Sequence, residues 1–236
     1  MKISVCLATY NGEKYIKEQL DSILSQLGND DEIIISDDNS TDDTINIIRS
    51  LNDERIKIYV NKTKGIVKNF ENALNNASGD YIFLADQDDV WLPEKVSISL
   101  AGLENYDIAV TNCKVTDVNL KEIIPSYFKI NDSKKGFLKN FYRSSYLGCC
   151  LAFKKKMLDD ILPIPDSLFL YHDWWIGYLA DAKYKVNFIN TPCMLYRRHD
   201  SNMSTTGAIS KQSLWKRFRD RFQLLYLGNL RLLKIK

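Results

Sequence analysis

The stretch YIFLADQDDVW, residues 81–91, joins an apolar run directly to three aspartates, Asp86, Asp88 and Asp89. A short apolar run of this kind predicts a buried strand. Carboxylates crowded at the end of a strand raise one another's pKa unless a cation neutralises them. Mg²⁺ and Mn²⁺ bind through one or two carboxylates together with phosphate oxygens. The stretch therefore predicts a site for Mn²⁺ or Mg²⁺; the alternative is a polar strand end where Asp89 caps the helix expected near Pro93.

The residues before this stretch alternate between apolar runs and helical patterns. Strands are predicted at residues 3–9, 32–36 and 56–60, with amphipathic helices between them. Ser40 and Asp43 form a capping-box pattern before the second helix. Such alternation predicts a parallel sheet covered on both faces, with ligands bound beyond the carboxyl ends of the strands. We expect the polar residues at those ends to converge: Thr9, Tyr10, Asn11, Asp37, Asp38 and residues 86–89.

The composition is that of a globular protein, with 45% hydrophobic and 26% charged residues in a chain of 236. Five cysteines without a CxxC pair indicate reduced, buried thiols in a cytosolic protein rather than a disulfide framework. No window approaches the roughly 18 to 20 apolar residues of a membrane span. The net charge of +2 gives no indication of nucleic-acid binding. We expect a cytoplasmic protein whose only membrane contact is at its surface.

Beyond residue 105 the alternation loosens. A strand is predicted at 147–153, a helix from Asp173 onward, and two closing strands, VNFIN and CMLYR. Residues 211–236 contain eight lysines or arginines and a single acid, so a basic tail follows an acidic body. One helical face of this tail gathers apolar residues, namely Leu214, Phe218, Phe222 and Leu225, with Lys216, Arg217 and Arg219 around it. Two interpretations stay open, a helix docked on the body and an interfacial helix attracted to anionic lipid.

Three motifs taken together resemble a known family. SVCLATYNGEKYI, IIISDDNSTDDT and LADQDDVW, in this order, are similar to the opening half of the family 2 inverting glycosyltransferases with the GT-A fold. The resemblance covers residues 2–200 and implies an α/β fold. In it, a Rossmann-like nucleotide-binding half (1–105) is fused to an acceptor-binding half (106–205) around one mixed, mostly parallel sheet. Residues 206–236 would form a basic amphipathic helical extension.

The resemblance also implies roles for individual residues. Asp38 would accept the pyrimidine N–H, Asp86 would face the ribose or the donor sugar, and Asp88 would bind the metal with Asp89 assisting. Lys68 lies in a segment similar to the one that runs beside the base and ribose. The remaining implied donor-binding positions are Thr9, Tyr10, Asn11, Glu13 and Gln87.

Two later segments complete the expected site. In YHDWW, Asp173 matches the family's general base, with an N-cap aspartate as the alternative. Trp174 and Trp175 are candidates for stacking on the acceptor sugar, with core packing as the other explanation. In RRHDSNMS, His199 resembles a position that reaches the diphosphate or the metal. Its neighbours Arg197 and Arg198 would neutralise phosphate, unless the segment is simply a solvated basic loop.

These expectations describe a metal-dependent, inverting glycosyltransferase. It would move one sugar from dTDP-rhamnose or a UDP-hexose to a saccharide acceptor, lipid-linked in surface-polysaccharide synthesis such as O-antigen or capsule. The anionic inner face of the membrane would be contacted through residues 211–236. A metal-dependent sugar nucleotidyltransferase is the rival enzyme, although TYNGEK lacks its glycine-rich signature. A non-catalytic nucleotide-sugar-binding protein is the other rival, and the set Asp38, Asp86, Asp88 and Asp173 disfavours it.

Overall fold

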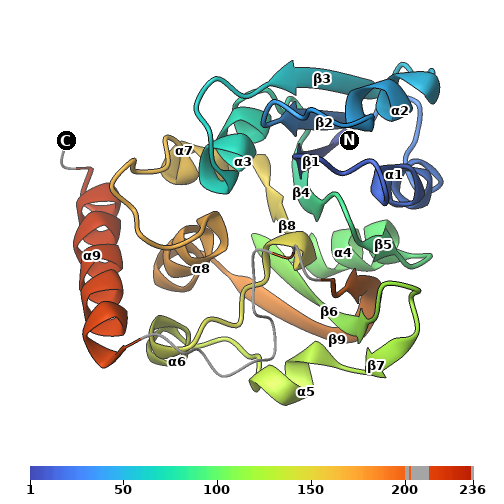
Figure 1. The fold of residues 1–236 in the computed structure, drawn as a ribbon. Coiled ribbons are helices and arrows are strands. Elements are labelled where there is room, and N and C mark those ends of the chain that lie inside the picture. Colours follow the sequence, from blue (N-terminus) through green and yellow to red (C-terminus); the bar gives the residue numbers. More distant parts are fainter. Residues whose placement is uncertain (200–201, 203–212, 235–236) are drawn as a thin grey trace.

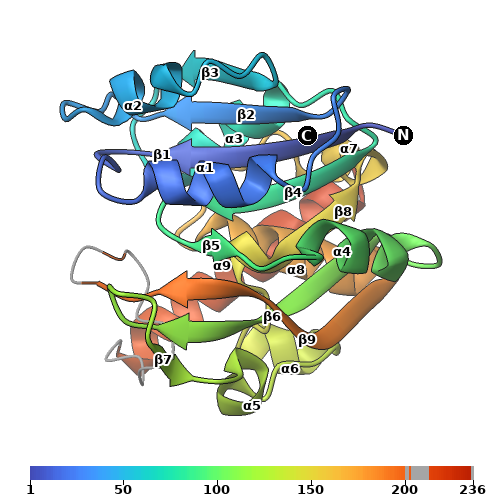
Figure 2. The ribbon, with the colours of Figure 1, turned by 90° about the vertical axis from the view of Figure 1, so that its right-hand side faces the viewer.

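The computed structural model describes residues 1–199, 202 and 213–234. Its first half has the predicted alternation, with strands β1 (Ile3–Thr9), β2 (Glu32–Asp37), β3 (Ile56–Val60) and β4 (Tyr81–Asp86). All four are parallel, in the order β3-β2-β1-β4. Helices α1 (Ile16–Leu24) and α2 (Thr44–Ser50) cover one face, and α3 (Ile66–Asn75) covers the other (Figure 2). This arrangement is what buries every residue of β1 and β2.

The second half extends the same sheet. Beyond β4 the order continues β8-β6-β9-β5, with β7 paired to β6, giving nine strands in the described part of the chain (Figure 1). The added strands are β5 (Val90–Trp91), β6 (Ile108–Thr116), β7 (Glu122–Ile124), β8 (Leu151–Lys154) and β9 (Val186–Arg197). Strands β5, β7 and β8 run against the others, so the sheet is mixed and mostly parallel. The expected fold class is confirmed.

Helices of the second half cover both faces of the extended sheet. Helix α4 lies on the same side as α1, and α8 lies on the opposite side (Figure 2). The helices and 3₁₀ turns between β5 and β9 are α4 (Lys95–Leu103), α5 (Tyr127–Asn131), α6 (Phe137–Tyr142), η1 (Gly148–Cys150), η2 (Lys155–Met157), α7 (Leu158–Ile161) and α8 (His172–Lys183). The described parts of these helices include none that is long and apolar enough to cross a membrane.

Several local predictions need correction. The strand expected at 147–153 begins with the turn η1, and only Leu151–Lys154 pairs as β8. The two closing strands are one strand, β9, whose pairing with β6 shifts register beside Pro192 because proline cannot donate to the ladder. The capping box is absent: Ser40 donates to Asp37, and Asp43 makes no capping hydrogen bond. The five cysteines are free and buried, as predicted.

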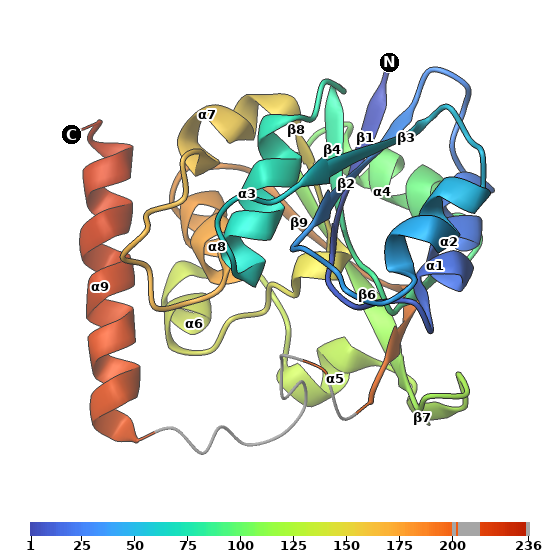
Figure 3. The same cartoon turned by 45° about the horizontal axis from the view of Figure 1, so that its top comes forward.

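The basic tail forms helix α9 (Leu214–Leu232), which stands beside α8 at one side of the molecule (Figure 3). Leu224 and Asp220 are buried against the body. At Gly228 a Cβ atom would lie 2.1 Å from the ring of Tyr178, so only glycine permits this close approach. Tyr178 Oη also donates to Asn229 Oδ1 over 3.1 Å. The docked interpretation of the tail is therefore confirmed.

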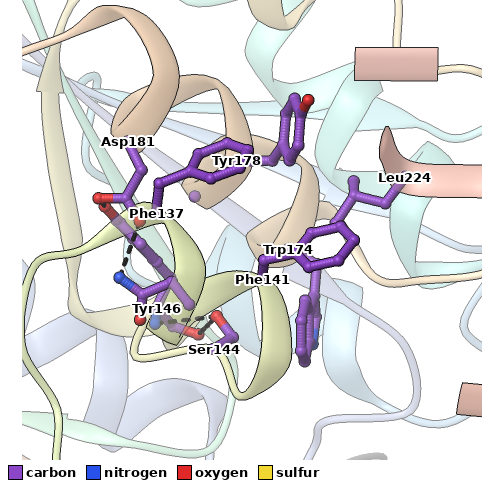
Figure 4. A pocket seen from close by; sticks show the side chains of 10 residues that line it. Phe137, Phe141, Ser144, Tyr146, Trp174, Tyr178, Asp181 and Leu224 are labelled. Atoms are coloured by element: carbon purple, nitrogen blue, oxygen red, sulfur yellow. Dashed lines mark hydrogen bonds between the residues drawn. The ribbon is translucent and has the colours of Figure 1, made fainter. Parts of the chain in front are cut away.

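A small cavity marks the junction of α6, α8 and α9 (Figure 4). Its volume is about 10 Å³, room for about one water molecule. On one side Asp181 accepts hydrogen bonds from Tyr146 Oη and Asn140 Nδ2. Trp174 and Leu224 line another side. The cavity is a packing gap beneath α9 and is too small for a sugar.

The face of α9 that points away from the body differs from the predicted one. Trp215, Phe218, Phe222 and Tyr226 are between 59% and 80% exposed. Their spacing of three and four residues places them along one stripe of the helix. Phe218 and Phe222 thus belong to the outer surface, whereas Leu225 is half-buried. The aromatic stripe is available for contact beyond the chain.

Candidate active site

The carboxyl ends of β1 and β4 form the centre of the site. In the order β3-β2-β1-β4, the chain leaves β1 toward β2 on one side and crosses from β3 to β4 on the other side. The direction of the connections therefore reverses between β1 and β4, which is the point where open α/β sheets bind ligands. Ala8 is paired with Asp86, and Thr9 with Asp37 on the other side. The polar strand ends therefore converge as predicted.

Gln87 links the end of β4 to the end of β1 through hydrogen bonds. Its Oε1 accepts from Thr9 Oγ1 at 2.6 Å and from Tyr10 N at 2.8 Å, and its Nε2 donates to Tyr10 O at 3.0 Å. A Cβ on Gly12 would approach Gln87 Oε1 to 2.4 Å, so the first turn needs glycine there. Both ends of the Gln87 amide are thus bound to protein, and the residue positions the turn. Tyr10 is 51% exposed at the rim.

The loop after β1 is tied to the loop after β2. Asn11 Oδ1 accepts from Thr41 N at 2.8 Å, and Asn11 N donates to Ser40 Oγ at 2.9 Å. Glu13 Oε2 accepts from Asp43 N at 3.0 Å at the start of α2. Asn11 and Glu13 thereby fix the shape of the expected nucleoside pocket.

Asp38 follows β2 and adjoins the end of β1, because its backbone N–H donates to Thr9 O at 2.9 Å. Its two carboxylate oxygens accept from Asn61 Nδ2 at 2.9 Å and from Gly65 N at 3.0 Å. Asp38 therefore orders the 61–65 loop and keeps a spare lone pair on each oxygen. Lys68 is engaged elsewhere: its ammonium contacts Glu71 Oε2 at 2.5 Å and pairs with Asp166. Lys68 links α3 to the segment before α8.

Asp88 and His199 meet although 111 positions separate them. His199 Nε2 lies 2.7 Å from Asp88 Oδ2, and Asn202 Nδ2 donates to the same oxygen at 3.3 Å. The ring of Tyr15 stacks on the imidazole with centroids 5.1 Å apart. Strand β9 ends just before His199, which brings the imidazole to the end of β4. The carboxylate oxygen suits Mg²⁺ or Mn²⁺, and the imidazole nitrogen at the same point favours Mn²⁺ of the two, with phosphate oxygens completing the site.

Asp89 departs from the capping interpretation of the sequence. It is fully buried, and its Oδ1 accepts from Arg197 N at 3.0 Å, so it does not cap α4. Its Oδ2 has no hydrogen-bond partner among the described residues. Burial and the charge of Asp88 raise its pKa well above the ordinary value. One carboxylate oxygen each of Asp86 and Asp89 and the Sγ of Cys149 lie within 4.8 Å of one another, so these three residues could also hold a metal ion.

Arg197 belongs to the framework rather than to a solvated loop. Its side chain is 4% exposed, Nε donates to Asp88 O at 2.8 Å, and Nη1 donates to Val118 O at 2.7 Å. The guanidinium also pairs with Glu18 and lies over the ring of Tyr15. Because these donors are engaged, Arg197 supports the backbone of Asp88. The predicted role of Arg197 in binding phosphate is therefore wrong.

Asp173 is in the first turn of α8, where Tyr171 and not Asp173 is the N-cap. Its carboxylate accepts from Trp174 N at 2.8 Å. Burial raises the pKa of Asp173 to about 7. Asp86 also has a pKa raised to about 7, by burial first and then by the charges of Asp88 and Asp173. The two carboxylates from opposite halves of the chain thus share one electrostatic environment.

The residues flanking Asp173 pack against neighbouring side chains. Trp175 is fully buried and its Nε1 donates to Ile161 O at 2.9 Å, so core packing is the correct interpretation. Trp174 is half-buried, and the guanidinium of Arg221 lies 3.8 Å from its ring centre. His172 packs against Phe70, and burial lowers its pKa to about 3, so it is uncharged at neutral pH.

A parallel β3-β2-β1-β4 unit with clustered aspartates at its switch point, joined to a second half that supplies Asp173, defines a glycosyltransferase of the GT-A type. The match to a family model, Glycosyl transferase family 2, extends over residues 4–162. The chain belongs to glycosyl transferase family 2. This membership removes the sugar nucleotidyltransferase from consideration.

Two curated relatives illustrate the family's range. The dTDP-rhamnosyl transferase RfbG of Shigella flexneri is 32% identical over 230 residues, covering 89% of this chain and 77% of the relative. A GalNAc(5)-diNAcBac-PP-undecaprenol beta-1,3-glucosyltransferase of Campylobacter jejuni is 29% identical over 243 residues, covering 99% and 74%. Their names specify different donor sugars, so identity at this level does not select one.

Among solved structures, the fold is similar to that of S. aureus TarS, residues 1–349, in complex with UDP. The TM-score is 0.71 at 23% sequence identity, with 98% of this chain and 66% of that chain covered. This likeness confirms the GT-A fold. The chain thus spans about two thirds of that structure.

Proposed function

We propose that the protein is a metal-dependent, inverting glycosyltransferase that transfers one sugar from a nucleoside-diphosphate sugar to a lipid-linked saccharide in surface-polysaccharide synthesis. The donor would be dTDP-rhamnose or a UDP-hexose. The observation that carries the proposal is the meeting of Asp88 and His199 at 2.7 Å. Their position beside the expected nucleoside pocket suits a cation that binds the donor diphosphate.

The nucleoside would lie between the β1 loop and Asp38. Thr9, Tyr10, Asn11 and Glu13 shape one wall, and an unused lone pair on Asp38 would accept the N–H of a pyrimidine base. Asp86 would accept hydrogen bonds from hydroxyl groups of the ribose or the donor sugar. When bound, Mn²⁺ or Mg²⁺ would neutralise the charge that develops on the departing diphosphate. Asp88 and His199 would hold that cation, while Asp89 and Gln87 keep the motif in place.

Asp173 would act as the general base. Its pKa of about 7 matches the working pH of such an enzyme, because a base is most effective when its pKa lies close to that pH. The carboxylate would remove the proton of the acceptor hydroxyl as the oxygen attacks the anomeric carbon. Attack from the face opposite the departing diphosphate would invert the configuration at the anomeric carbon.

The proposed partner surface is the cytoplasmic face of the membrane. The exposed stripe of Trp215, Phe218, Phe222 and Tyr226 is accompanied by basic side chains of the same helix. Aromatic residues with adjacent lysines and arginines are typical of helices that lie in an anionic interface. A lipid-linked acceptor would be met at this surface.

A thermal-shift screen of nucleotide sugars with Mn²⁺ or with EDTA tests the proposal. The protein should be stabilised by one dTDP- or UDP-sugar, and only with the metal. NMR of the product should then show an anomeric configuration opposite to that of the donor. Stabilisation by no nucleotide sugar, or a product with retained configuration, would contradict the proposal.

A further inference from the structure

Two arginines of α9 lie one turn apart without a carboxylate partner among the described residues. Arg221 is half-buried, and its guanidinium covers the ring of Trp174 at 3.8 Å. Arg217 precedes it by four residues and lies over the ring of Tyr142 at 5.5 Å. Like charges at this spacing on a helix repel each other. Burial and the charge of Arg217 together lower the pKa of Arg221 to about 10.

The donor groups of Arg221 are largely unused. Within the described ranges, its guanidinium makes one long hydrogen bond, 3.4 Å from Nη2 to Tyr142 O. Its Nε is buried and has no partner there. The nearby acid on α9, Asp220, is paired with Arg219 at 2.9 Å. A guanidinium offers five N–H donors in a fixed fork, so leaving them unmatched in a partly buried place is costly.

The position of this pair is adjacent to the proposed catalytic base. Trp174, on which Arg221 rests, directly follows Asp173 at the start of α8. Arg221 thus contacts the turn of α8 that carries Asp173. The fork of an arginine matches the geometry of phosphate oxygens, and aromatic support of a guanidinium is common in such sites.

We propose that Arg217 and Arg221 bind a phosphate group of the acceptor, the phosphate ester that joins the acceptor saccharide to its carrier. The inference rests on the proposed function, since it concerns the acceptor of the same reaction. The shared chemistry is a phosphate ester, and phosphates of membrane lipid headgroups are the other possible source. Trp174 is a positioning residue for this site, because its ring supports Arg221. The ring face that Arg221 covers is not open to a stacked sugar.

The decisive experiment compares two acceptors with the same saccharide, one a short-chain alkyl diphosphate ester and the other a neutral alkyl glycoside, without membranes. Arg221→Gln should raise KM for the diphosphate acceptor about tenfold and leave kcat unchanged, because a charge-assisted hydrogen bond is lost. KM for the neutral acceptor should not change. Arg221→Lys, which keeps the charge but loses the fork, should give an intermediate KM.

Lys216→Gln is the matched control, because it removes one exposed positive charge from the same helix. It should leave both KM values as in the wild type. If KM for the diphosphate acceptor rises as much in Lys216→Gln as in Arg221→Gln, the effect comes from the overall positive charge of the helix. That result would overturn the site. An equal rise for both acceptors in Arg221→Gln would make Arg221 a packing residue and would also overturn it. An effect of Arg221→Gln seen only with anionic vesicles would assign the site to lipid headgroups.

Calorimetry separates this inference from the proposed function. A short-chain alkyl diphosphate should bind the wild-type protein without divalent metal, bind Arg221→Gln about tenfold more weakly, and bind Asp88→Asn unchanged. No binding to the wild type, or loss of binding in Asp88→Asn alone, would overturn the phosphate site. Failure of the wild type to transfer sugar to either acceptor would count against the proposed function, and the calorimetry would still decide the site.

Discussion

Replacing Asp173 by Asn should abolish transfer and at the same time stabilise the folded protein. Burial raises the pKa of Asp173 from its ordinary value of 3.8 to about 7. Each pKa unit corresponds to about 1.4 kcal/mol, so the upper bound of the penalty for the ionised carboxylate is about 4 kcal/mol. Because the side chain keeps some contact with water, we expect about 2 kcal/mol in practice. Asn keeps the shape without the charge, so it removes this penalty.

The pH dependence follows from the sign of this shift. The pKa of folded Asp173 is above the unfolded value, so between about pH 4 and pH 7 the folded state binds more protons. Stability of the wild type therefore falls as pH rises through that window, and the full penalty applies above about pH 7. Asp173→Asn should be more stable than the wild type at pH 8, with the difference shrinking toward pH 4. In the wild type, kcat/KM should rise about tenfold per pH unit below pH 7 and then level off.

Urea unfolding at pH 5 and pH 8, together with pH–rate profiles, tests both statements. Asp160→Asn is the control with the opposite sign. Although burial acts to raise the pKa of Asp160, hydrogen bonds from Lys183 and Tyr184 hold it below the ordinary value. Its removal should destabilise the protein at neutral pH and spare activity. Retained turnover in Asp173→Asn would refute the role of Asp173 as general base. Equal stability of the wild type and Asp173→Asn at pH 8 would refute the penalty for the buried charge.

Three further outcomes are expected. His199→Ala should weaken Mn²⁺-dependent donor binding at least tenfold by calorimetry, because one ligand of the proposed cation is lost; unchanged binding would remove His199 from the metal site. Gly228→Ala should lower the free energy of unfolding by about 1–3 kcal/mol, since its methyl group overlaps Tyr178; a neutral result in urea unfolding would mean that α9 moves freely on α8. Replacing Trp215, Phe218 and Phe222 by Ser should reduce sedimentation with anionic vesicles about tenfold or more while the melting temperature is kept. Tyr106→Ser, at an exposed aromatic residue outside α9, is the control for loss of an aromatic side chain. Equal sedimentation of the wild type and the triple variant would exclude the stripe.

The first half of the fold was predictable because local patterns decide it. Residues 3–9 and 32–36 are apolar almost without interruption, as strands buried on both faces must be. The meeting of polar residues at the strand ends then follows from parallel topology alone. Asp38 and Asp86 could be placed at one edge of the sheet for this reason.

The parts that could not be predicted depend on contacts between distant segments. Asp89 accepts from Arg197 N, 108 residues away, and nothing in ADQDDVW indicates that its third aspartate turns inward. The burial of Arg197 depends in the same way on Glu18 and Val118. A WW pair at the start of a helix does not reveal which ring enters the core. The docking of α9 decides this for Trp174, since Arg221 covers one face of its ring.

The central claim is that a divalent cation held by Asp88 and His199 binds the diphosphate of the donor. Calorimetric titration of the preferred nucleotide sugar into the wild type and Asp88→Asn, each with Mn²⁺ and with EDTA, tests it directly. We predict that binding to the wild type requires Mn²⁺ and disappears in Asp88→Asn. Equally tight binding in EDTA, or in the variant, would contradict the account.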